Sequence, residues 1–271
     1  MDYQDLLRMK EKLSSVIEKK PRIGIVLGSG LSYLQKDIVV EKTVDYADIP
    51  GHPICTNKSH KGQYLFGTWK NVPVAILNGR LHYFEGYESQ ECVIPQRLLA
   101  LLGVEAVILT NAIGGITSGP GSVQVNTDQI TALVPSPLRG KNIDELGTRF
   151  PDMSHVYDLQ ATKEILEEGR KRNLPCVEGV FMQFPGPQFE TPAEIQMAKV
   201  LGATGVGMST GIEAIALRHM GVKVVALSLV TNWAAGISKA PLDDAEVLET
   251  ATKSEKTMTS LFEIAMEVLT R

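Results

Sequence analysis

Short apolar runs alternate with amphipathic segments along most of the chain. Leu6, Leu7, Leu13 and Ile17 recur at helical spacing among charged residues, which predicts an opening helix that ends at Pro21. Runs rich in β-branched and aliphatic residues follow and predict strands over seven segments, at 23–27, 64–69, 72–77, 104–110, 129–134, 177–184 and 222–230.

The pattern between these runs indicates the kind of sheet. Lys70-Asn71 separates two of them and is typical of a tight hairpin, so at least one strand pair should be antiparallel. The stretches "VEAVILT" and "VKVVALSLVT" are apolar at consecutive positions, as in strands that are covered on both faces. The sequence therefore predicts an α/β fold with a twisted mixed β-sheet flanked by helices on both faces.

Three helix starts are marked by polar residues. Thr191 with Glu194, and Thr210 with Glu213, fit the capping-box spacing, and Asp243 with Glu246 is an acidic relative of it. In contrast, "PSPLRGKNIDELGTRFPDMS" is a long polar connection with little periodicity, and loops of that length are commonly functional or packed on a neighbour.

Length and charge narrow the classes of function. With 271 residues and no repeat or linker, residues 1–271 are expected to form one domain. The chain has 27 Lys and Arg residues and 31 Asp and Glu residues, which gives a net charge of −4. This charge balance lacks the excess of basic residues that binding to nucleic acid or to an anionic membrane requires. The charged N-terminus lacks the apolar core of a signal peptide, and no run approaches the roughly 18 apolar residues of a membrane span.

Cysteine usage points to a reducing compartment. Cys55, Cys92 and Cys176 are odd in number, far apart and without a C-x-x-C pair. This argues against a disulfide framework and against a zinc site. We therefore expect a cytoplasmic protein without a metal.

A short glycine loop follows the first predicted strand. In "LGSGL", Gly28 and Gly30 flank Ser29, and such a loop can bring backbone N–H groups close to a phosphate. A tight turn without a ligand would have the same sequence. The dinucleotide fingerprint is excluded because Tyr33 stands where its third glycine should be, and the lysine of a P-loop is absent.

A second cluster of polar residues follows the strand at 72–77. Arg80 and His82 in "NGRLHYFEGY" are two residues apart, so in an extended segment they share a face. A guanidinium fork beside an imidazole forms an anion clamp, although a surface arginine beside a solvated histidine is the alternative. His60 is either a third donor or a structural histidine.

Three further strand or helix ends carry candidate ligand contacts. Glu190 precedes a helix start and can favour the helix dipole or accept ring N–H groups of a base, with Phe189 as an aromatic wall. Ser209 can cap a helix or donate to an oxyanion. Asn232 can form a turn or bind a heterocycle through its amide. Because open α/β sheets bind ligands at strand ends, these residues together predict one ligand site.

The motifs taken together resemble those of the trimeric purine nucleoside phosphorylases. The matching segments occur in the family's order and span nearly the whole chain. They are "LGSGL" (27–31), "SHKGQYLFG" (59–67), "GRLHYFEGY" (79–87), "LTNAIGG" (109–115), "SPLRG" (136–140), "RFPDMS" (149–154), "GPQFETPAE" (186–194), "VGMST" (206–210) and "SLVTNWAAGI" (228–237).

The resemblance implies a role for each matching residue. It implies that inorganic phosphate, a co-substrate, is held by Ser29, His60, Arg80, His82, Ser209 and the backbone N–H of Ala112. It implies that Glu190 and Asn232 hold the purine, Phe189 packs on it and Met208 lies under the ribose. Phe150 would reach into a neighbouring subunit's site, so the resemblance implies a homotrimer. The implied catalytic residues are Asn232, Glu190 and His82.

Two positions depart from the family pattern. Phe84 stands where a tyrosine near the ribose is usual, so one ribose hydroxyl is expected to lose a partner. Asp244 is the best match to a histidine close to the 5′-hydroxyl, and it can accept a hydrogen bond there or cap a helix.

The resemblance implies phosphorolysis of 6-oxopurine ribonucleosides or deoxyribonucleosides, with no cofactor. Inosine, guanosine and xanthosine would yield a free base and ribose or deoxyribose 1-phosphate, and the reaction would be reversible. A nucleoside hydrolase, a methylthioadenosine phosphorylase-like enzyme and a catalytically silent nucleoside-binding protein remain as alternatives.

Overall fold

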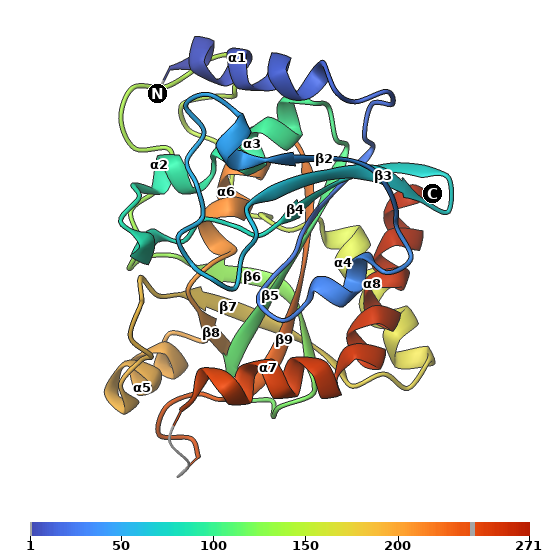
Figure 1. Cartoon of the computed structure of the whole chain (residues 1–271). Coiled ribbons are helices and arrows are strands. Elements are labelled where there is room, and N and C mark those ends of the chain that lie inside the picture. The colour runs from blue at the N-terminus through green and yellow to red at the C-terminus, as the bar shows by residue number, and fades with distance from the viewer. Residues whose placement is uncertain (1, 239–241) are drawn as a thin grey trace.

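The centre of the fold is a twisted mixed β-sheet with helices on both faces (Figure 1). The computed structural model describes residues 2–238 and 242–271. Within them the strand order is β2-β3-β4-β1-β5-β8-β7-β6-β9, with a further pairing of β5 and β9. The strands are β1 (Ile23–Val26), β2 (Val39–Asp45), β3 (Gln63–Trp69), β4 (Val72–Asn78), β5 (Ala106–Gly115), β6 (Val123–Ile130), β7 (Cys176–Gln183), β8 (Gly205–Gly207) and β9 (Lys223–Trp233).

The first half of the sheet is a meander joined to parallel strands. β2, β3 and β4 run antiparallel, and β1 lies parallel between β4 and β5. The predicted hairpin is confirmed, because Trp69 pairs with Val72 across Lys70 and Asn71, whose φ values are 45° and 69°. Positive φ at both central residues is the backbone of the tight hairpin turn.

The second half closes on itself. β5 pairs with β8 on one side and with β9 on the other, and β7 and β6 complete the ring. β5 therefore belongs to both halves. Its last residues lie beyond the end of β1, where Val26 pairs with Leu109. This continuation carries residues 110–115 to the carboxyl edge of the parallel strands.

The helices cover the two faces of the sheet (Figure 1). Alternation along β1 separates the two cores: Ile23 and Ile25 pack in the cluster that includes α4 and α8, whereas Val26 packs with α1, α3 and α6. The α-helices are α1 (Tyr3–Ser14), α2 (Ser89–Cys92), α3 (Ile94–Leu101), α4 (Leu159–Lys171), α5 (Pro192–Val200), α6 (Gly211–His219), α7 (Asp244–Lys253) and α8 (Glu255–Thr270). Short 3₁₀ turns are η1 (Ser32–Gln35), η2 (Tyr46–Asp48) and η3 (Tyr83–Glu85).

Three strands differ from the seven predicted segments, and one of them is the three-residue β8, which lies outside all seven. β6 covers Val123–Ile130 rather than 129–134, because its polar residues Gln124 and Asn126 are buried and paired inside the closed half of the sheet. β2 was not predicted. It is an edge strand that is exposed at almost every position, so it lacks the alternation by which a strand is recognised.

One of the two threonine capping boxes forms. At α5, Thr191 Oγ1 accepts from the Glu194 backbone N–H at 3.2 Å, and Glu194 Oε2 accepts from the Thr191 N–H at 2.7 Å. The box predicted at α6 is wrong. Thr210 has a φ of 76° and makes no cap hydrogen bond, Gln183 Oε1 accepts from the Ile212 N–H at 2.9 Å, and Glu213 is used elsewhere.

The long connection before α4 has neither helix nor strand between β6 and Leu159, as its lack of periodicity predicted. None of the helices in the described part of the chain combines the length and the apolar character needed to cross a membrane.

Candidate active site

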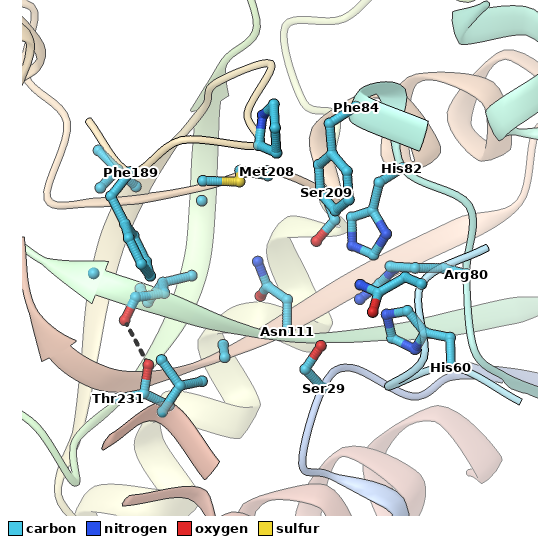
Figure 2. A pocket seen from close by; sticks show the side chains of 18 of the residues that line it. Ser29, His60, Arg80, His82, Phe84, Asn111, Phe189, Met208, Ser209 and Thr231 are labelled. Atoms are coloured by element: carbon cyan, nitrogen blue, oxygen red, sulfur yellow. Dashed lines mark hydrogen bonds between the residues drawn. The ribbon is translucent and has the colours of Figure 1, made fainter. Parts of the chain in front are cut away.

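A cavity of about 620 Å³ opens at the carboxyl edge of the parallel strands (Figure 2). It is lined by residues of β5, β8 and β9, by the loops that follow β1, β2, β4, β7 and β8, and by Val247 of α7. Eleven of the residues predicted from the sequence line it: Ser29, His60, Arg80, His82, Phe84, Ala112, Phe189, Glu190, Met208, Ser209 and Asn232. Figure 2 shows His60, Arg80 and His82 at one end and Phe189 and Thr231 at the other.

Two stacked imidazoles mark one end of the cavity. The ring centroids of His60 and His82 are 5.1 Å apart, with an interplanar angle of 24°. Burial, together with the nearby His82 and Arg80, lowers the pKa of His60 to about 3. His60 is therefore neutral at physiological pH, and its buried Nε2 has no hydrogen-bond partner.

Glu85 orients His82. Its Oε1 accepts from the His82 backbone N–H at 2.8 Å and lies 3.3 Å from Nδ1, while Oε2 accepts from the Thr56 N–H and hydroxyl at 2.6 and 2.7 Å. Burial alone would raise the pKa of Glu85, but hydrogen bonds from His82 and Thr56 outweigh it and hold the pKa at about 2. A carboxylate at Nδ1 leaves Nε2 as the ring nitrogen that can face a ligand.

Arg80 differs from the predicted clamp. Its side chain is 1% exposed, and its Nε and Nη2 donate to Glu213 at 2.9 and 2.8 Å, while Nη1 donates to the Thr110 carbonyl. One fork of the guanidinium therefore binds a carboxylate that is itself 2% exposed and also accepts from Gln96. Three of the five guanidinium N–H groups are therefore used within the protein, and one N–H on each of Nη1 and Nη2 remains for an anion.

The glycine loop lies against β5. A Cβ on Gly28 would come within 2.7 Å of the Asn111 Cα, so only glycine allows this approach. The Gly28 N–H donates to Thr110 Oγ1 at 3.1 Å, and Gly30 has a φ of 72°. The loop thereby presents Ser29 to the cavity beside the continuation of β5.

The opposite end of the cavity carries a buried carboxyl group, an amide and an aromatic ring. Glu190 is buried, and burial raises the pKa of its carboxyl group. Asn232 is held in one orientation, because Thr231 Oγ1 donates to its Oδ1 at 2.9 Å and its Nδ2 donates to the Trp233 carbonyl at 3.0 Å. One N–H of that amide remains for a ligand. Phe189 lies at this end, half-exposed.

Phe84 and Met208 line the wall between the two ends. The Phe84 ring stacks on His82 with centroids 4.6 Å apart, so it offers packing and no hydrogen bond. Gly186 lies against both side chains, since a Cβ there would come within 2.5 Å of Met208 Sδ and 3.0 Å of the Phe84 ring.

Two predicted residues are not among those that line the cavity. Phe150 lies in the irregular connection and is 86% exposed, so it does not contribute to the cavity of its own chain. Asp244 is the first residue of α7, but its side chain lies outside the described structure. Within residues 2–238 and 242–271, no three or more His, Cys, Asp or Glu residues form a cluster able to hold a metal ion.

Sequence reasoning missed several lining residues, among them Asn111, Glu85, Thr56 and Thr231. Asn111 lies within "LTNAIGG", but only the backbone of Ala112 was assigned there. Asn111 could have been recognised as a candidate, because a polar residue in an otherwise apolar strand needs a partner for its polar atoms.

Comparisons with known proteins agree with this geometry. A model of the phosphorylase superfamily matches residues 22–267. Purine nucleoside phosphorylase 1 of Geobacillus stearothermophilus is 40% identical over 247 residues, which cover 90% of this chain and 89% of that protein. A schistosoma purine nucleoside phosphorylase in complex with hypoxanthine superposes with a TM-score of 0.91 at 33% identity, covering 98% and 97% of the two chains.

A further structure, of Schistosoma mansoni purine nucleoside phosphorylase in complex with adenosine, has a TM-score of 0.91 at 32% identity and covers 98% of this chain and 97% of that one. The likeness thus extends over nearly the whole chain in sequence and in fold. The chain belongs to the phosphorylase superfamily and, within it, to the purine nucleoside phosphorylases, which are pentosyltransferases.

Proposed function

We propose that this protein catalyses the reversible phosphorolysis of 6-oxopurine ribonucleosides and 2′-deoxyribonucleosides, with inosine, guanosine and xanthosine as candidate substrates. The products are the free base and ribose or deoxyribose 1-phosphate. One observation carries the proposal: a single cavity has imidazole, hydroxyl and guanidinium donors at one end and a buried carboxylate with an amide at the other.

The donor-rich end is the proposed phosphate site. Ser29 and Ser209 make only long side-chain contacts, at 3.4 Å to Ser59 and 3.3 Å to Thr210, so both hydroxyls can turn to an anion. His82, oriented by Glu85, donates through Nε2. The proposed phosphate ligands are Ser29, His60, Arg80, His82, Ser209 and the backbone N–H of Ala112.

In the proposed mechanism, phosphate itself is the nucleophile. A phosphate oxygen forms a bond to C1′ while the bond from C1′ to N9 breaks, and the electron pair of that bond goes to the purine. The sugar carries oxocarbenium-like positive charge at the transition state, and the phosphate anion stabilises it. No protein nucleophile is required.

The leaving purine is stabilised at the other end. The free N–H of Asn232 Nδ2 can donate to the N7 lone pair as negative charge develops on the base. After the bond from C1′ has broken, the purine anion takes up a proton from water. The Glu190 carboxylate accepts from N1–H, and Phe189 packs on the ring. N1–H is present in hypoxanthine and guanine and absent from neutral adenine, so the Glu190 contact favours 6-oxopurines.

The proposed assembly is a homotrimer. The exposed Phe150 belongs to the long connection, and a large apolar side chain at such a position is commonly covered by another subunit. Analytical ultracentrifugation should give a trimer mass, and Phe150→Ser should raise the KM for nucleoside. A monomer with full activity would contradict the assignment.

The decisive experiment measures hypoxanthine released from inosine, with and without inorganic phosphate, beside guanosine, xanthosine and adenosine. We expect release only with phosphate and the lowest kcat/KM for adenosine. Equal release without phosphate would indicate a hydrolase. A higher kcat/KM for adenosine would refute the roles of Glu190 and Asn232, and tight binding without turnover would indicate a silent binding protein.

A further inference from the structure

Asn111 is the most unusual polar residue of the cavity. It lies on β5, next to Ala112 and beyond the last paired residue of β1. The residue is 2% exposed, and neither Oδ1 nor Nδ2 has a hydrogen-bond partner within the described part of the chain. A buried amide without partners costs free energy, so native proteins rarely retain one without a ligand or water to satisfy it.

The larger polar side chains around it each have at least one hydrogen-bond partner. Arg80 binds Glu213, His82 binds Glu85, and Asn232 binds its neighbours Thr231 and Trp233. Among the described residues, the buried and unpartnered side-chain atoms of this cavity belong to His60 and Asn111. The Asn111 amide is therefore the largest unmet hydrogen-bonding capacity in the site.

Its position is between the two ends of the cavity. Gly28 brings the Ser29 loop directly onto the Asn111 backbone. Figure 2 shows the Asn111 amide between Ser29 and Ser209, with His82 and Arg80 on one side and Phe189 on the other. A side chain at this position can contact both the proposed phosphate and the sugar of the nucleoside.

We propose that Asn111 binds phosphate and sugar together: Nδ2 donates to an oxygen of the attacking phosphate, and Oδ1 accepts from a ribose hydroxyl. This inference rests on the proposed function. In a β-ribonucleoside the base lies on one face of the sugar, and the 2′- and 3′-hydroxyls lie on the face from which phosphate attacks C1′. An amide has one donor end and one acceptor end, which match an anion and a hydroxyl side by side.

Phe84 makes the acceptor half of this contact more important. Its ring stacks on His82 and offers no oxygen to a sugar hydroxyl. Asn111 supplies a free acceptor in the same cavity. The residue is thereby a determinant of sugar recognition as well as of phosphate affinity.

The test measures kcat/KM of Asn111→Leu for inosine, 2′-deoxyinosine and 3′-deoxyinosine. It also measures the KM for phosphate by varying the phosphate concentration. The wild-type enzyme in the same assay tests the proposed function separately, because its turnover must depend on phosphate whatever Asn111 does. Asn78→Leu is the matched control, since Asn78 is also a buried asparagine at the carboxyl end of a strand, β4, but does not line the cavity.

Each of the two hydrogen bonds is expected to contribute about tenfold. Asn111→Leu should therefore raise the KM for phosphate about tenfold and lower kcat/KM for inosine about a hundredfold. For the deoxy analogue that lacks the bound hydroxyl, the loss in kcat/KM should be only about tenfold. Asn78→Leu should leave both the phosphate KM and the ratios among nucleosides unchanged.

Folding stability separates this role from a structural one. Because the Asn111 side chain has no hydrogen-bond partner among the described residues, Asn111→Leu should leave the urea midpoint unchanged or raise it. Asn111→Ala serves as a second variant if the larger leucine does not fit. An unchanged phosphate KM, or equal losses for all three nucleosides, overturns the proposal.

Discussion

The ion pair between Arg80 and Glu213 gives the sharpest prediction about stability. Both side chains are almost fully buried, at 1% and 2% exposure, and two N–H groups of the guanidinium meet the two carboxylate oxygens. Glu213→Gln keeps the shape of the side chain and removes its charge. Arg80 is then left as a buried cation without a counterion.

The expected loss is large because of this burial. Breaking a buried pair by removing one partner costs about 3–5 kcal/mol, which is a substantial part of the about 5–15 kcal/mol that stabilises a typical domain. The exposed pair of Arg22 and Glu105, with an N–O distance of 3.1 Å and side chains 40% and 60% exposed, supplies the control. Glu105→Gln should cost less than about 1 kcal/mol.

Urea denaturation followed by circular dichroism measures both losses. The free energy of unfolding should fall by several kcal/mol in Glu213→Gln and hardly at all in Glu105→Gln. Equal losses of stability in the two variants would refute the argument that burial makes the pair costly to break.

Three further predictions concern single residues. Burial lowers the pKa of His52 from 6.5 to about 4, so the unfolded chain takes up a proton that the folded ring excludes. Stability should thus fall by roughly 3 kcal/mol as the pH drops from about 6.5 to about 4, and urea titrations should show a smaller fall in His52→Gln. Asn232→Ala should lower kcat about 10²–10³-fold with little change in the urea midpoint, and normal turnover would remove Asn232 from the mechanism. Burial raises the pKa of Glu190 above the ordinary glutamate value of 4.5. The kcat/KM for inosine should therefore rise with pH as Glu190 loses its proton, with a midpoint above 4.5. The same rise of kcat/KM in Glu190→Gln would contradict this assignment.

Much of the fold followed from local patterns. Apolar runs, the Lys70-Asn71 turn and the capping box at Thr191 depend on neighbouring residues and on backbone conformation, so they can be recognised along the chain. The pairing of β5 with both β8 and β9 joins residues far apart in the sequence, and no local pattern predicts it. The exposed edge strand β2 was also missed, because it has no buried face and therefore no alternation of apolar and polar residues in its sequence.

The site divides in the same way. The residues expected at the strand ends could be named from the sequence and from its resemblance to a family, and eleven of these residues line one cavity. Their hydrogen-bond partners could not be predicted in this way. Glu213 does not form the expected cap but binds Arg80, which lies 133 residues away in the sequence, and the Asn111 side chain has no hydrogen-bond partner among the described residues. Hydrogen bonds and charges inside a protein depend on which groups meet and on how far water is excluded, and both are settled when distant segments pack together.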